Sequence, residues 1–433
     1  SDTNKDFFKK YIQIIGKPEE KIKSFQNEKK VNLSNKLIFE CYKFFYDELI
    51  KQFKEENMNL EKQKEYLIKA VSTMVTNFVV MSAQISDEKS AYNIFLTLND
   101  RGLDLAITDL LKTLIFSICG DEWPSAKEKW DDIREMLYNI NVNTFLRHYW
   151  LSNYGIVKEK DLLDALEDKI KTKEMALKFL EELKNDAECY EALLNPKKDY
   201  WQDDLIIKKI NELYILSKQT VLPLLMASSQ KLEPGDFQIL VENLISFIFR
   251  YLTIAEQENK VIEKLFSDIA IELRRGHIHS IDQIIEKLRK VHIPDEQFLV
   301  NFNQKEIKDS KMAKYILEKI ENHLDSEKEV NETITWEHIL PKNPDSEWTD
   351  YMKTNQMDKD ELVNKIGNMT LSLGRVNKKV RNRFFTKKRD EYYKTMTKLK
   401  INEPLKEITN WTGKDIENRQ KWLGDYAVKI WKI

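Results

Sequence analysis

Glycine and proline are scarce in this chain, and their scarcity limits the folds that it can adopt. The 433 residues include ten glycines and nine prolines, and six of those glycines fall in the first 360 residues. Tight turns between strands depend on these two residue types, because they adopt or pre-set the backbone angles that such turns need. The sequence therefore leaves little room for an all-β fold, and we expect a mainly α protein.

Long helical patterns occupy most of the chain. Residues 37–53 and 241–275 repeat apolar side chains at three- and four-residue spacing, and neither run contains glycine or proline. This spacing is typical of amphipathic helices. We predict a large helical domain over residues 1–325, with turns at residues such as Pro196 and Gly276.

The composition is that of a soluble globular protein, with 42% hydrophobic and 33% charged residues. The three cysteines lie far apart without a CxxC pair, so neither a disulfide framework nor a thiolate metal site is expected. The longest charge-free stretch, residues 70–86, is shorter than a membrane-spanning helix and includes polar residues. The first residues show no signal-peptide pattern, so we expect a cytoplasmic protein without a membrane anchor.

Positive charge is concentrated near the C-terminus. The whole chain has a net charge of -2, but residues 331–433 carry 21 basic and 15 acidic side chains. Within them, residues 374–400 hold 11 basic and two acidic residues, with four aromatic residues interleaved. A solvated helix face is the ordinary explanation of such a run. Its one-signed charge nevertheless favours a polyanionic partner such as nucleic acid.

The sequence pattern changes after about residue 326. Residues 329–340 are rich in β-branched side chains and partly alternate, and residues 366–373 form a second strand pattern. Residues 377–400 then return to helical spacing. We predict a small α+β domain over residues 326–433, with further helices at its C-terminal end.

The first of these strand patterns contains an acid next to a histidine, Glu337 and His338. Cleavage of a phosphodiester at a one-metal site needs a base and oxygen ligands for a divalent cation. His338 can act as the base, and Glu337 and Asn377 can each supply an oxygen. Neighbouring residues on a regular strand point to opposite faces, so Glu337 and His338 share a site only if the strand ends there. Pro341 favours such an end.

These residues resemble the motifs of the HNH (His-Me finger, ββα-metal) nucleases. The acid-His-x-x-Pro motif is Glu337 to Pro341, the second motif is Gly367-Asn368, and the third is Asn377. The wider pattern is similar to the C-terminal nuclease domain of GmrSD-type, modification-dependent (type IV) restriction endonucleases. Further residues fall at the places expected for that domain: Trp348, Lys388, Trp411, Ile416, Arg419 and Trp431.

The resemblance implies a role for each motif residue. His338 would be the base, Asn368 would pin the loop that orients it, and Glu337 and Asn377 would bind Mg²⁺ or another divalent cation such as Mn²⁺. Basic residues of the same region are expected to contact DNA phosphates without recognising sequence: Lys378, Lys379, Arg381, Lys387 and Lys388.

A second resemblance lies upstream. Residues 91–116 are similar to a stretch of the partner module of the same enzymes, in which the motif residues are Asn99, Arg101, Gly102 and Asp109. Core packing and a helix-surface pair of Asp109 with Lys112 are the alternative explanations. The D-G-Q-Q-R motif of that module's nucleotide-handling part does not occur, so nucleotide binding is not predicted for this chain.

The leading hypothesis is a Mg²⁺-dependent HNH endonuclease that hydrolyses DNA, in restriction of modified phage DNA. The alternative is a non-catalytic DNA-binding or regulatory scaffold that contains an inert HNH unit. His277 and His279 lack a third and a fourth ligand nearby, so a solvated loop is expected there rather than a zinc site.

Overall fold

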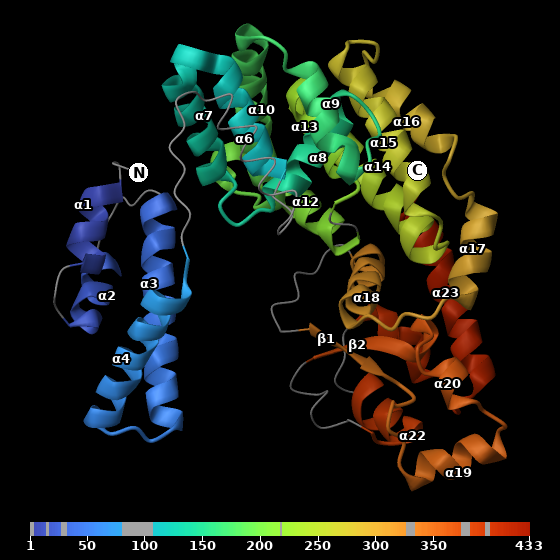
Figure 1. Cartoon of the computed structure of the whole chain (residues 1–433). Coiled ribbons are helices and arrows are strands. Elements are labelled where there is room, and N and C mark those ends of the chain that lie inside the picture. The colour runs from blue at the N-terminus through green and yellow to red at the C-terminus, as the bar shows by residue number, and fades with distance from the viewer. Residues whose placement is uncertain are drawn as a thin grey trace. The chain divides into compact units, whose positions relative to one another are not determined.

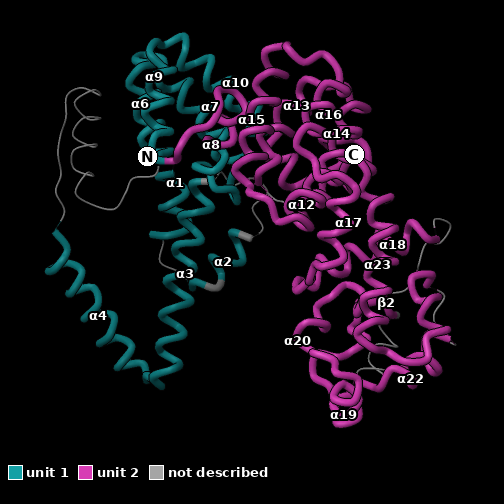
Figure 2. The backbone as a smooth tube through the Cα atoms, turned by 90° about the vertical axis from the view of Figure 1, so that its right-hand side faces the viewer, with its two compact units in different colours: residues 1–145, 160–188 teal, residues 146–159, 189–433 magenta. Residues whose placement is uncertain are grey.

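The computed structural model confirms a mainly helical chain with a small α+β region (Figure 1). It describes residues 4–13, 17–26, 33–79, 107–216, 219–325, 334–373, 382–394 and 399–433. The chain divides into two units (Figure 2). Unit 1 holds residues 1–145 and 160–188, and unit 2 holds residues 146–159 and 189–433.

Unit 1 begins with short helices around a small aromatic cluster. Its first elements are α1 (Lys5–Phe8), the π-helical η2 (Lys9–Gln13), α2 (Pro18–Gln26), α3 (Leu33–Glu55) and α4 (Leu60–Asn77). The rings of Phe25 and Phe39 stack at 4.0 Å, and Phe7 and Tyr11 pack around them. The hydroxyl of Tyr66 on α4 donates to Gln52 of α3 at 2.8 Å.

The rest of unit 1 is a helical layer held partly by ion pairs. Its elements are α6 (Ile107–Cys119), η3 (Gly120–Glu122), α7 (Trp123–Met136), α9 (Leu162–Lys169) and the first part of α10 (Lys173–Leu194). Lys129 on α7 pairs with Glu181 of α10 at 2.5 Å.

Unit 2 contains a helical bundle before its two strands. Its helical elements are α8 (Val142–Asn153), which begins in unit 1, η4 (Glu159–Asp161), which continues into unit 1, α11 (Lys198–Trp201), α12 (Asp204–Leu216), α13 (Leu222–Lys231), α14 (Pro234–Ile248), η5 (Phe249–Ile254), α15 (Asn259–Arg274), α16 (Ile281–Arg289), α17 (Asp295–Gln304) and α18 (Ser310–Leu324). The run predicted over residues 241–275 is divided in two, because residues 255–258 are not helical and Glu256 has a φ of 49°. Polar residues occupy this break.

One continuous apolar segment of unit 2, Pro234–Ile254, is long and apolar enough to cross a membrane by length and composition. It comprises α14 and the π-helical η5, and 67% of its apolar window is buried inside the bundle. A helix in the core of a bundle meets the same criterion.

The α+β region follows the bundle. Its elements are β1 (Ile334–His338), α19 (Ser346–Thr354), α20 (Lys359–Leu362), η6 (Ile366–Asn368), β2 (Met369–Leu373), α22 (Phe385–Lys388), η7 (Arg389–Tyr393), η8 (Lys400–Lys406) and α23 (Gly413–Ile430). The two strands pair antiparallel, with Ile334 opposite Leu373 and His338 opposite Met369. The helix predicted over residues 377–400 begins at Phe385 in the described part, because Phe384 before it is extended.

Large aromatic side chains form the core of this region. Trp348, Trp411, Phe385 and Tyr392 are fully buried, and the rings of Phe385 and Trp411 stack at 5.1 Å. The residues that follow β1, the short helices and α23 therefore contribute to one hydrophobic core.

Two buried polar side chains tie α23 to the bundle. The Arg250 guanidinium donates to the main-chain carbonyls of Val428 and Trp431 at the end of α23, and it also pairs with Asp295 at 2.6 Å. These bonds satisfy carbonyls that a helix end leaves without partners. The Gln420 amide donates to the carbonyl of Phe302, at the end of α17, at 2.8 Å.

Helix α23 also lies directly against the turn before β2. A Cβ atom placed on Gly367 would lie 2.3 Å from the carbonyl oxygen of Ile416 and 2.8 Å from the amide nitrogen of Gln420. Both neighbours are backbone atoms of α23, which cannot move aside alone. The turn therefore requires glycine at this position.

We expect Gly367→Ala to lower the free energy of unfolding by about 3 kcal/mol or more, because the new methyl group overpacks a buried contact. Urea unfolding followed by circular dichroism measures the change. Gly235→Ala is the matched control, since a Cβ there has no neighbour within 4 Å. Equal stability of the two variants would contradict the close approach of α23.

Candidate functional site

Glu337 and His338 are the last two residues of β1, and their side chains leave opposite faces of the strand. Glu337 pairs with Thr370 and His338 with Met369, so regular pairing continues to the end of β1. The His338 ring contacts the ring of Trp336 on one face, with 4.8 Å between centroids. The condition for a shared site, a strand that ends at Glu337, is not met, because β1 ends at His338 and the alternation of side chains along a strand separates the acid from the histidine.

The Glu337 carboxylate points toward the helical segment formed by α22 and η7. Its residue is only 6% exposed. Oε1 accepts a hydrogen bond from the Tyr393 hydroxyl at 3.0 Å, and Oε2 lies 3.5 Å from the Lys388 ammonium. Oε2 accepts no hydrogen bond from the described residues. The attraction of the Lys388 ammonium is thus the interaction that holds Oε2 among the described residues.

Lys388 lies inside the protein rather than on its surface. Its side chain is 0% exposed, and its ammonium donates to the main-chain carbonyl of His338 at 2.8 Å. Burial lowers the pKa of Lys388, and the nearby Glu337 carboxylate opposes that shift. The prediction that Lys388 contacts DNA phosphates is wrong, because its charge does not reach solvent.

The neighbouring Lys387 has the opposite environment. Its side chain is 54% exposed, and its ammonium pairs with Glu347 on α19 at 2.9 Å. A solvated pair of this kind contributes little stability and exchanges easily for other anions. Of the two lysines, only Lys387 can contact a phosphate.

The His338 imidazole is neutral near pH 7. Burial first, and then the positive charges of Lys342 and Lys388, lower its pKa to about 4. Its Nε2 atom is buried and has no hydrogen-bond partner among the described residues. A neutral imidazole carries a nitrogen lone pair that can accept a proton, which is the property that a general base needs.

Asn368 fixes the loop that follows His338. Its Oδ1 accepts from the Leu340 amide at 2.8 Å and from the Trp411 indole at 3.0 Å. Its Nδ2 donates to the carbonyls of Leu340 at 3.0 Å and Val363 at 3.2 Å. These four bonds use the whole hydrogen-bonding capacity of the amide. Asn368 is fully buried and lies where it can orient the loop.

Two further polar residues contact the two strands: Tyr393, which carries no motif signal, and Arg419, which falls at an expected place of the resembled domain but without an assigned role. Tyr393 holds Glu337, and Arg419 on α23 donates to the Thr370 hydroxyl at 3.1 Å. Burial lowers the pKa of Arg419 to about 10. Thr370 lies opposite Glu337 in the hairpin. Sequence reasoning misses both roles, because they depend on which helix face meets the hairpin.

Several predicted residues cannot be placed. Asn377, Lys378, Lys379 and Arg381, together with Asn99, Arg101 and Gly102, lie outside the described residues. Asp109 is exposed in the first turn of α6, and the Lys112 ammonium lies 5.6 Å from the Phe116 ring centroid. Among the residues that the structure describes, no three His, Cys, Asp or Glu side chains form a group that could hold a metal.

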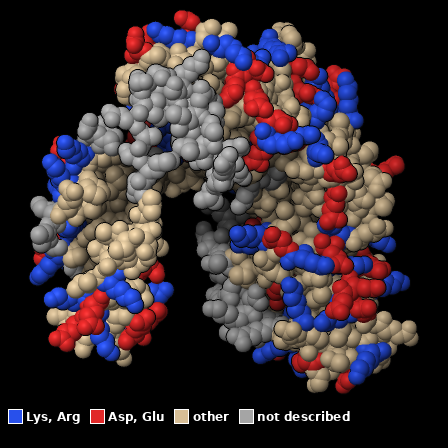
Figure 3. Space-filling view, in the orientation of Figure 1, with Lys and Arg blue, Asp and Glu red and all other residues tan. Residues whose placement is uncertain are grey.

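Acidic partners offset much of the described positive charge near the hairpin. Arg383 pairs with Glu391, and both Arg389 and Lys394 pair with Asp390. On the face shown in Figure 3, basic and acidic side chains are interspersed. The described part of this region is therefore less one-signed than its sequence composition.

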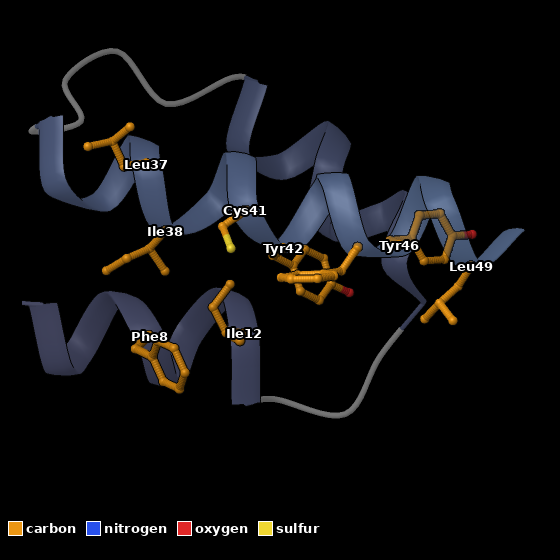
Figure 4. Close-up of a pocket in the computed structure, with 9 residues that line it drawn as sticks. Phe8, Ile12, Leu37, Ile38, Cys41, Tyr42, Tyr46 and Leu49 are labelled. Atoms are coloured by element: carbon orange, nitrogen blue, oxygen red, sulfur yellow. The ribbon is translucent and has the colours of Figure 1, made fainter. Parts of the chain in front are cut away.

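Unit 1 contains an apolar groove of about 630 Å³ between α1 and α3 (Figure 4). Phe8 and Ile12 line one side, and residues of α3 from Leu37 to Leu49 line the other. No acidic or basic side chain lines it. The groove lacks the groups that the predicted chemistry needs.

Residues 292–425 match the family described as GmrSD restriction endonucleases, C-terminal domain. The C-terminal region is therefore similar to the C-terminal domain of GmrSD-type restriction endonucleases. The match begins upstream of residue 326 and includes α17 and α18, which both pack against α23. It supports a nuclease that acts on DNA. No curated protein matches the chain.

For the metal-free protein, we expect the His338 imidazole to titrate with a midpoint near pH 4, because burial and two cations disfavour its protonated form. NMR of ¹³C-labelled histidine measures the midpoint, and the signal lost in His338→Gln assigns it. A midpoint near the ordinary value of 6.5 would contradict the buried environment.

We also expect Asn368→Ala to reduce the free energy of unfolding by about 3 kcal/mol, because it leaves the Leu340 amide and the Trp411 indole without partners in the core. Denaturant titration measures the loss. Asn355→Ala is the control, since Asn355 is exposed and its amide bonds only to Tyr351 of its own helix. A change there is expected to stay within about 0.5 kcal/mol.

Proposed function

We propose that this chain is a Mg²⁺-dependent HNH endonuclease that hydrolyses DNA phosphodiester bonds. The family match supports a restriction nuclease. The observation that carries the finer proposal is the strand–strand–helix order around His338, whose buried imidazole is neutral and lies beside a loop fixed by Asn368. This arrangement resembles the ββα-metal unit from which the HNH nucleases take their chemistry.

The residues present are chemically suited to a divalent cation. Glu337 offers a buried carboxylate oxygen that accepts no hydrogen bond from the described part of the chain, and hard oxygen ligands suit Mg²⁺ or Mn²⁺. Mg²⁺ keeps several waters and commonly takes only one or two protein carboxylates. Glu337 with the amide oxygen of Asn377 is therefore a sufficient protein ligand set, and the remaining positions belong to water and phosphate.

The chain's own residues divide the work. The His338 imidazole accepts the proton of the attacking water. Asn368 keeps the loop after β1 in place, so the imidazole keeps its orientation. Lys387, with Lys378, Lys379 and Arg381, neutralises backbone phosphates. The cation, when bound, supplies positive charge to the scissile phosphate and the leaving oxygen.

One observation favours the alternative of an inert HNH unit within a DNA-binding scaffold. The Glu337 carboxylate faces Tyr393 and Lys388, whereas His338 lies on the other face of β1 with Trp336. Such a divergence suits a unit that binds DNA without cutting it. The two functions differ in a single property, cleavage in the presence of a divalent cation.

We expect His338→Ala to abolish nicking of supercoiled plasmid in Mg²⁺ and to leave DNA retention unchanged, because the variant loses only the base. Gel separation of nicked from supercoiled plasmid measures the first, and a filter-binding assay in EDTA measures the second. His277→Ala is the control, since His277 is exposed and belongs to the loop after α15. Undiminished nicking by His338→Ala would remove the assignment of the base.

We further propose that the cleaved DNA is modified phage DNA and that the protein acts in the cytoplasm as part of a restriction system. Comparing cleavage of modified and unmodified phage DNA, with and without a nucleoside triphosphate, tests the substrate class and any nucleotide control. Equal cleavage of both DNAs would show that the modification is not recognised.

A further inference from the structure

The hairpin of unit 2 rests on a lysine that is completely buried. Lys388 is 0% exposed, yet it follows the solvent-exposed Lys387 directly. Its ammonium contacts two groups of β1: the main-chain carbonyl of His338 at 2.8 Å and the Glu337 carboxylate at 3.5 Å. Both belong to the pair of residues at the centre of the proposed chemistry.

A buried ammonium is costly to keep, because it loses its hydration. A Leu or Met side chain of similar volume would fill the same space without that cost, and replacing buried ion pairs in this way is often neutral or stabilising. Packing alone therefore gives no reason for a lysine here. An apolar side chain could make neither of its two contacts: the carbonyl needs a hydrogen-bond donor, and the carboxylate attracts a positive charge.

The contact with the His338 carbonyl fixes the backbone at the end of β1. Without such a bond, the peptide group of a residue at the end of a strand can rotate, and the direction of its side chain then changes with it. The ammonium donates to this carbonyl from α22, while Asn368 holds the Leu340 amide two residues later. The peptide that carries His338 is thus held from both sides.

The contact with Glu337 holds the carboxylate in one position. Tyr393 donates to Oε1 and Lys388 faces Oε2, so the carboxylate is oriented before any cation arrives. A preorganised ligand and a preorganised base lower the cost of reaching the reactive arrangement.

We propose that Lys388 is a positioning residue of the candidate site, which acts through the His338 carbonyl and the Glu337 carboxylate and does not touch DNA. The inference rests on the proposed nuclease function. It separates two adjacent lysines by role: Lys387 binds the substrate backbone, and Lys388 orients the reacting groups. The two roles differ because neighbouring residues of α22 point in different directions.

The test compares Lys388→Met with Lys387→Met. Both remove one charge and leave an unbranched side chain that is one atom shorter than lysine. Three quantities are measured for each variant: the melting temperature, the Kd for DNA in EDTA at several salt concentrations, and the single-turnover rate of cleavage in Mg²⁺ at DNA concentrations well above Kd.

For Lys388→Met we expect the rate at saturating DNA to fall about 100-fold, the loss typical of a misplaced reacting group, while Kd stays unchanged. For Lys387→Met we expect a weaker Kd, whose slope against log salt falls by about 1. If Lys388→Met does not fold, Lys388→Gln replaces it, because its amide keeps a donor in the buried space. For Lys388→Gln we expect a smaller fall of the rate at an unchanged Kd, because the amide can still donate to the His338 carbonyl but no longer places a charge at Glu337.

Two results would overturn the inference. A wild-type rate at saturation with a lower melting temperature would make Lys388 a purely structural residue. A weaker Kd with an unchanged rate would make it a phosphate contact. Failure of the proposed function is seen separately, because the unaltered protein would then cut no DNA in Mg²⁺ or Mn²⁺.

Discussion

The antiparallel pairing of β1 with β2 is the interaction on which the candidate site depends. Its register decides which side chains meet: Glu337 lies opposite Thr370, and His338 lies opposite Met369. The Asn368 amide closes the pairing at one end by holding both polar groups of the Leu340 backbone. A shift of one residue would move the acid to the outer face and the histidine to the inner one. The same ladder of hydrogen bonds thus decides that Glu337 faces Tyr393 and that His338 lies beside Trp336.

The face of β1 and β2 that carries Glu337 is buried, yet charged side chains lie on it and against it. Glu337 is negative, and Lys388 and Arg419 are positive, so these three buried residues have a net positive charge. Arg419 donates to Thr370 and to a main-chain carbonyl, but two of its nitrogens have no partner in the described part of the chain. Charges held in a medium of low polarisability act strongly on their surroundings. Burial first, and then the positive charges of Lys342 and Lys388, lower the pKa of His338.

The sequence was sufficient for the helical class, for the two strands and for the order of the motif residues. It could not show which lysine of the pair at 387 and 388 faces inward, because that depends on where α22 begins. Phe384 is extended, so α22 begins at Phe385, and the phase of this helix turns Lys388 inward and Lys387 outward. The break after η5 was missed for a related reason: apolar spacing continues across it while the backbone turns at Glu256. Local patterns predict the type of an element well, and its ends depend on tertiary contacts.

The hydrogen bonds between α23 and the bundle determine how large the cooperative folding unit is. The carbonyls of Val428 and Trp431 are capped by Arg250, and the Gln420 amide is satisfied by Phe302. A fragment that starts just before β1 would leave these groups in need of water and would expose the face of α23 that meets α17 and α18. The strands that carry the motif residues therefore belong to a larger folding unit, which includes α23 and the helices that pack against it. The smallest fragment that folds on its own must therefore include Arg250, which lies some eighty residues before β1 in the sequence.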